Sequence, residues 1–201
     1  MCTRRCVVAL IFLSLTLPTV ATERVPDFRN FAYPWADEAD FVPSTWKWLP
    51  LPISTVVRLA NGRFEFPSEG YPWPASLYFK EVTTGNLGQD APKAAAITLS
   101  YGTGGTANWS YLYVYELSKA PRLLGILRSG SRADGGLIEV KIDHQLLILK
   151  FADPARRTAD CCSDGFIRER YKWNGAAFTE VGAAERGDAA NPNPEDKNSH
   201  R

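Results

Sequence analysis

Two adjacent cysteines, Cys161 and Cys162, are the residues of this chain best suited to redox or disulfide chemistry. The other two, Cys2 and Cys6, lie within an expected N-terminal export signal and would be removed with it. In an oxidising compartment the remaining pair can form a vicinal disulfide, stay as two free thiols or pair with a second chain, and the sequence leaves these alternatives open. Two thiolates with no histidine or further cysteine beside them make a poor zinc site, so we expect no metal here.

A second candidate site is a row of aromatic side chains at every other position of one expected strand. Trp109, Tyr111, Tyr113 and Tyr115 share one face of this strand, because side chains alternate between the two faces. If that face is exposed, the four rings could stack on the flat apolar face of a ligand. The alternative is that the face packs into the core, as large aromatic side chains usually do. We name these four residues the aromatic row and take them as the ligand-binding candidates.

The sequence offers few side chains that are suited to catalysis. After the expected signal only His144 and His200 remain, and His144 lies in an apparent turn with no nucleophile beside it. The chain has no GxSxG motif. Paired carboxylates could act as acid and base, but such pairs form through space and nothing in the sequence marks one. We therefore predict no catalytic residue, and keep as alternatives a secreted hydrolase with paired carboxylates and a redox role for the cysteine pair.

Two loop motifs resemble cofactor sites but each lacks a required part. Residues 102–107 read GTGGTA, close to the dinucleotide pattern GxGxxA, yet a strand follows where that pattern needs a helix. Residues 84–91 resemble an Asp-rich calcium loop, but only Asn86 and Asp90 remain as ligands, and Ala91 takes the place of the turn glycine. We expect no cofactor.

The N-terminus predicts export. Arg4 and Arg5, an apolar run from Val7 to Leu17 and small residues up to Ala21 form the order of a signal peptide over residues 1–21. The run is too short to span a bilayer, so no stable membrane anchor is expected after processing. Removal of the signal leaves 21 of the 23 basic side chains against 22 acidic ones, which argues against a nucleic-acid partner. We expect a periplasmic or secreted protein, exported by the general or the twin-arginine route.

The elements that must position these residues read as β structure. Residues 22–53 combine many aromatic side chains with a proline every few residues, which predicts an extended arm packed on the domain. Residues 54–182 contain ten short apolar runs, with hairpin turns expected at Asn61-Gly62 and Asn174-Gly175. Residues 183–201 lack an apolar period and predict a disordered tail. The fold class is all-β, a single antiparallel domain of about ten strands, either a sandwich or a partly open barrel.

Several segments resemble a group of uncharacterised exported bacterial proteins, namely 101–107, 112–115, 130–136, 160–162 and 170–175. The cysteine pair followed by Arg-Tyr-x-Trp-x-Gly is also similar to the LppP/LprE-type lipoproteins. The resemblance covers roughly residues 28–181 and implies an envelope or periplasmic setting. This chain departs from it in lacking a lipidation cysteine and in having Ser163 where proline usually follows the pair. The leading hypothesis is a non-catalytic binding or structural module whose partner is an envelope component or a small ligand.

Overall fold

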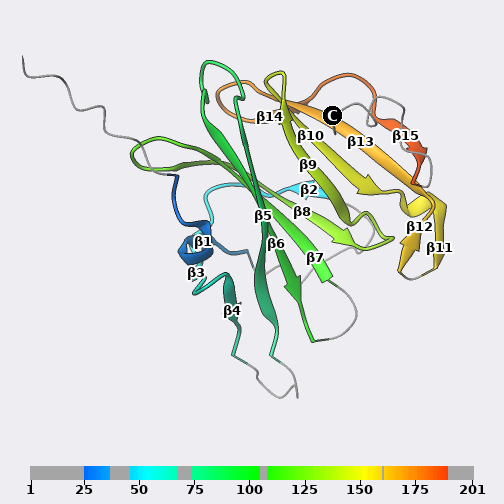
Figure 1. Ribbon diagram of the computed structural model, residues 1–201, viewed down its shortest axis with the longest axis horizontal. Helices are drawn as coiled ribbons and strands as arrows, with labels where there is room; N and C mark the ends of the chain where they lie inside the picture. Colours follow the sequence, from blue (N-terminus) through cyan, green and yellow to red (C-terminus); the bar gives the residue numbers. More distant parts are fainter. Residues whose placement is uncertain (1–24, 37–45, 68–73, 105–107, 160, 190–201) are drawn as a thin grey trace, which may run out of the picture.

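Runs of alternating apolar residues form two antiparallel sheets that pack face to face (Figure 1). The computed structural model describes residues 25–36, 46–67, 74–104, 108–159 and 161–189. The predicted signal peptide, residues 1–21, lies outside these ranges. No helix in the described part of the chain is long and apolar enough to cross a membrane.

The larger sheet has six strands in the order β2-β8-β7-β6-β5-β4; in Figure 1 β2 is cyan, β4 is teal and the other four are green. Its strands are β2 (Lys47–Trp48), β4 (Arg63–Glu65), β5 (Ser76–Gly85), β6 (Ala94–Gly102), β7 (Asn108–Glu116) and β8 (Arg122–Ser131).

The smaller sheet, yellow to red in Figure 1, has the order β14-β13-β10-β9, with β15 also paired to β13. Its strands are β9 (Leu137–Asp143), β10 (Leu146–Ala152), β13 (Gly165–Trp173), β14 (Phe178–Glu180) and β15 (Glu185–Asp188). Two short ribbons and two single-turn 3-10 helices complete the described elements: β1 (Ala32–Pro34) with β3 (Val56–Arg58), β11 (Arg157–Ala159) with β12 (Cys162–Ser163), η1 (Phe28–Asn30) and η2 (Pro154–Arg156).

The predicted all-β class and the ten predicted strands are confirmed. Each of the ten segments contains a strand of the structure, and the pairing between neighbours is antiparallel. Neither sheet closes on itself, so the architecture is a sandwich rather than a barrel.

The six-stranded sheet is apolar on both of its faces. On β7, Leu112 and Val114 face the smaller sheet, while Tyr111, Tyr113 and Tyr115 face the other way. The smaller sheet covers the first face with the side chains of Leu147, Leu149, Phe151, Tyr171 and Trp173, among others. The second face needs a different cover, because among the described residues the only further sheet on that side is the short β1–β3 ribbon.

The N-terminal arm provides that cover. Phe28, Tyr33 and Trp35 are buried against the second face. Further along the arm, the chain crosses the edge of the sheet as β2 and inserts two tryptophans into the other core. The Trp46 ring stacks on Phe151 at 4.1 Å and its indole N–H donates to Glu169. One arm therefore packs into both cores.

The turns agree in part with the sequence. Asn61 and Gly62 both have positive φ, at 53° and 82°, which confirms the predicted two-residue turn. The expected turn at Asn174-Gly175 is longer than predicted, since residues 174–177 separate β13 from β14. There the Asn174 side chain accepts hydrogen bonds from the N–H groups of Ala176 and Ala177, so asparagine closes the loop through its side chain.

The predicted disordered tail over 183–201 is wrong for its first part. Residues 185–188 form β15 at the edge of the smaller sheet, and residues 190–201 lie outside the described ranges. Backbone pairing with β13 holds this strand, and ion pairs add to it: Glu185 with Arg168 and Arg170, Arg186 with the buried Asp153, and Asp188 with Arg156. This strand contains no alternating apolar residues, so a search of the sequence for that pattern cannot find it.

The close approach of Trp48 to β8 depends on the missing side chain at Gly125. A β-carbon there would lie 2.8 Å from the Trp48 ring, which itself stacks on Phe178. We expect Gly125→Ala to lower the free energy of unfolding by about 1–3 kcal/mol, because the ring must move. Denaturant unfolding in a double-mutant cycle tests this, since the cost should largely vanish in a Trp48→Ala background. An equal cost in both backgrounds would contradict the contact.

Attachment of β15 should depend on pH through Glu185. Burial raises the pKa of this carboxyl, but Arg168 and Arg170 outweigh that effect, so the pKa lies below its ordinary value. The charged form then stabilises the folded strand above the ordinary carboxyl pKa, and this contribution is lost as the pH falls through the lowered pKa. Hydrogen-exchange protection of the β15 amides should fall over that range. Glu185→Gln should weaken the dependence, whereas Glu180→Gln, at an exposed position of β14, should retain it.

Candidate functional site

The aromatic row lies in the core rather than on the surface. Tyr111, Tyr113 and Tyr115 are 2%, 1% and 4% exposed, and rings of the arm cover them. The Tyr113 hydroxyl donates to the carbonyl of Pro34 on β1, and burial raises the pKa of Tyr113 well above its ordinary value. Trp109, at the end of the row, is half-buried and its ring lies beside that of Tyr101. The expectation of an exposed ligand platform is therefore corrected, because the arm occupies the face that a ligand would need.

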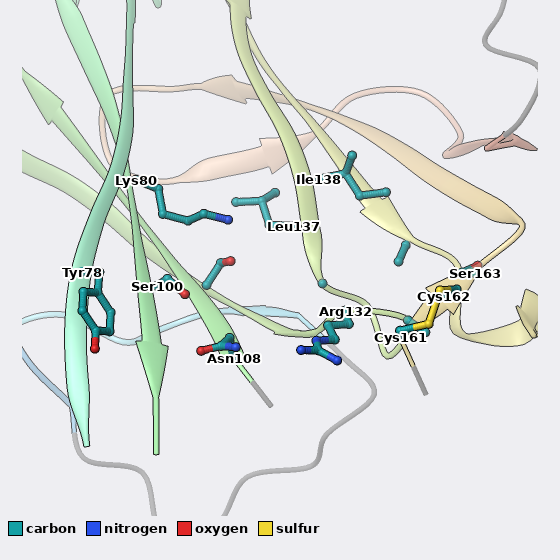
Figure 2. A pocket seen from close by; sticks show the side chains of 14 residues that line it. Tyr78, Lys80, Ser100, Asn108, Arg132, Leu137, Ile138, Cys161, Cys162 and Ser163 are labelled. Atoms are coloured by element: carbon teal, nitrogen blue, oxygen red, sulfur yellow. A yellow bond between two sulfur atoms is a disulfide. The ribbon is translucent and has the colours of Figure 1, made fainter. Parts of the chain in front are cut away.

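A cleft lies elsewhere, where the two sheets diverge. At one end β5 and β9 are in contact: Thr83 donates to the carbonyl of Val140, and a β-carbon at Gly85 would clash with Ile142. At the other end the strands separate and leave a cavity of about 690 Å³ between the sheets (Figure 2). This volume is within the range of small-molecule sites.

The floor of the cleft carries two serine hydroxyls. Ser100 on β6 and Ser110 on β7 are direct cross-strand partners on the face that elsewhere packs against the smaller sheet. Ser110 is only 7% exposed, and among the described residues neither hydroxyl has a hydrogen-bond partner. Two residues along β6, the buried Thr98 hydroxyl is also without a partner in that part of the chain. A buried hydroxyl such as that of Thr98 is costly to leave unpaired, whereas the hydroxyls of Ser100 and Ser110 line the cavity and can bind a polar group of a ligand.

The walls are mainly apolar and come from both sheets. Tyr78 on β5 and Ile138 on β9 are 38% and 52% exposed, unusually so for large hydrophobic side chains of this structure. Leu137 lies between them in Figure 2. The remaining wall includes Cys161 and Cys162, which form a vicinal disulfide at the start of β12.

Two cations reach the cleft from opposite sides. Lys80 projects from β5 into the space between the sheets, and Arg132 reaches it from the β8–β9 loop (Figure 2). Neither side chain has an ion-pair partner among the described residues. The described lining contains no aspartate, glutamate or histidine; besides the residues above it consists of Asn108, Ala133, Gly136, Ala152 and Ser163.

The carboxyl and imidazole groups of the described residues that could serve acid–base chemistry lie outside the cleft. Asp27 and Glu185 have lowered pKa values, the first through hydrogen bonds from Asn30 and Arg29. Glu169 accepts hydrogen bonds from Trp46 and Tyr171 in the core between the two sheets, away from the cleft. His144 is exposed in the β9–β10 turn beside Asp143. No group of metal-ligating side chains gathers in the described part of the chain.

Sequence reasoning found only one wall of this site. The cysteine pair was singled out, whereas Lys80, Ser100, Ser110 and Arg132 were missed. The sequence does contain a pattern that marks the floor of the cleft. The positions of β6 and β7 that face the smaller sheet are mostly alanine, leucine and valine, but near the end where Ser100 pairs with Ser110 they become polar. That signal becomes readable only when the pairing of the two strands is known.

Comparison of the chain with protein-family models, curated proteins and solved structures found no match. The resemblance to exported bacterial proteins and to the LppP/LprE-type lipoproteins therefore stays a prediction.

The loop that carries the disulfide is held mainly by Ser163. The Ser163 hydroxyl donates to the carbonyl of Asp153 at 2.7 Å and accepts from the N–H of Gly165. Both cysteines are exposed, and a bond between adjacent residues closes too small a ring to restrict the unfolded chain.

We therefore expect the double variant Cys161→Ser, Cys162→Ser to fold, with a loss of unfolding free energy below about 1 kcal/mol, against roughly 2–4 kcal/mol for a typical disulfide. Ser163→Ala should cost more, about 1–3 kcal/mol, because the N–H of the buried Gly165 loses its hydroxyl acceptor and the loop loses the hydrogen bond to the Asp153 carbonyl. Thermal and denaturant unfolding check both values. Global unfolding of the double cysteine variant would show that the disulfide supports the whole fold.

Proposed function

We propose that this protein is a non-catalytic binding module of the bacterial periplasm or envelope, and that it holds a small ligand in the cleft between its sheets. The observation that supports this most directly is the Ser110 hydroxyl on the floor of a cavity of about 690 Å³, because this largely buried residue has no hydrogen-bond partner among the described residues. A core built only for stability would place an apolar side chain at this position, as β7 does at Leu112 and Val114.

The composition of the lining supports binding over catalysis. Apolar walls with a few converging polar groups are typical of ligand pockets. Hydrolysis by paired carboxylates needs two carboxyl groups near the substrate, and the described lining offers none. The envelope setting rests on the predicted signal peptide and on the resemblance to exported bacterial proteins.

A neutral probe tests the proposal. 4-Hydroxyphenylacetamide combines a hydroxyl for the floor with a ring for the walls, and it should cause saturable amide shifts in β6, β7 and the β8–β9 loop. Ser100→Phe fills the cleft from its floor and should weaken binding by about tenfold or more, because the ring of the probe loses its buried contacts. Thr179→Phe, on the exposed side of β14, is the matched control and should bind normally. Shifts that ignore the Ser100 substitution would place the probe elsewhere and contradict the proposal.

A further inference from the structure

We infer that the cleft is selective for a small organic anion, in which one carboxylate or phosphate group is attached to an apolar or aromatic body. This inference rests on the proposed function and specifies the class of ligand that the cleft takes.

Charge at the cleft is unbalanced in one direction. The described lining has Lys80 and Arg132 and no acidic side chain. Several exposed arginines elsewhere in this structure are paired with carboxylates, for example Arg122 with Glu116 and Arg157 with Asp134. Two cations of different elements that point into one cavity attract an anion there, and the partly apolar surroundings reduce the screening of that attraction.

The backbone at Arg132 provides an independent argument. Its φ is +44°, in the left-handed region where glycine or asparagine is easier to accommodate. Two backbone hydrogen bonds stabilise the turn: the N–H of Asp134 donates to the carbonyl of Ser131, and the N–H of Gly136 donates to the carbonyl of Arg132. A β-carbon at Gly136 would lie 2.6 Å from the Arg132 backbone, so this glycine is what allows the turn to close. An arginine at a position that suits glycine points to a role for its side chain.

The two polar features lie at different places in the cleft and orient a ligand. The hydroxyls of Ser100 and Ser110 lie on the sheet that forms the floor. The Arg132 side chain comes from the loop beside the disulfide (Figure 2). Tyr78 and Ile138 leave apolar surface exposed along the walls. A molecule with a hydroxyl or amide at one end, a ring in the middle and an anionic group at the other end matches this sequence of contacts.

A charge series with one shared ring tests the inference. 4-Hydroxyphenylacetate, 4-hydroxyphenylacetamide and tyramine carry a negative, a neutral and a positive group on the same hydroxyphenyl body. We expect the acid to bind roughly tenfold more tightly than the amide and tyramine to bind weakest, with an advantage of the acid that shrinks as salt rises. Phenyl phosphate, run in parallel, shows whether the cleft prefers a phosphate or a carboxylate group.

Two variants assign the selectivity to the named cations. Lys80→Met keeps the aliphatic stem of the side chain and should reduce the preference for the acid over the amide, while binding of the amide persists. Arg132→Gly should do the same and leave the unfolding midpoint unchanged or raised, because glycine suits the left-handed backbone. Lys119→Met, in the exposed β7–β8 loop, is the control and should leave the preference intact.

The outcomes separate this inference from the function it rests on. Equal binding of acid and amide in the cleft would overturn the anion selectivity and leave the binding function standing. A preference that survives both Lys80→Met and Arg132→Gly would overturn the assignment to these residues. Failure of every probe to bind in the cleft would remove both. If Arg132→Gly lowers the midpoint, the turn needs arginine for stability, and Lys80→Met alone decides.

Discussion

The structure depends on a six-stranded sheet that is apolar on both faces. A sheet of this kind cannot leave either face in water without exposing a large hydrophobic surface, so each face requires its own cover. The smaller sheet covers one face, and the aromatic N-terminal arm covers the other. The arm then passes round the edge at β2, where Trp46 and Trp48 also enter the core between the sheets. Both cores thus depend on a segment whose prolines prevent it from forming a regular central strand.

The cleft follows from how the two sheets meet. At one end they are joined by the hydrogen bond from the Thr83 hydroxyl to the Val140 carbonyl. Because the strands of each sheet twist, the two sheets separate toward the other end. At the closed end the facing side chains are apolar and interlock. At the open end the same faces carry Ser100, Ser110 and Lys80, which cannot replace an apolar core and leave the cavity unfilled by protein. The site is therefore the unfilled end of the sandwich core, bordered by a disulfide loop.

Charge is used differently at the two borders of the smaller sheet. At the β15 border, arginines and carboxylates pair with one another. Burial raises the pKa of Glu185, but the guanidinium groups of Arg168 and Arg170 lower it by more, so the pKa lies below its ordinary value. These pairs reinforce a polar strand that is paired with β13 through its backbone. At the cleft border, Lys80 and Arg132 have no such partners in the described chain. The first arrangement serves the fold, and the second is available to a ligand.

The sequence by itself determined the fold class, the ten main strands and the Asn61-Gly62 turn, because alternation and turn chemistry are local properties of the chain. It also determined that Trp109, Tyr111, Tyr113 and Tyr115 share one face of a strand. Only the tertiary structure decided that this face is covered. The alternation of side chains along a strand shows which of them share a face, but not which other part of the chain packs on that face. The same limit applies to the cleft and to β15: Lys80, Ser110 and Arg132 are far apart in the chain, as are Glu185 and Arg168. Their juxtaposition results from strand pairing and sheet packing, which no local pattern records.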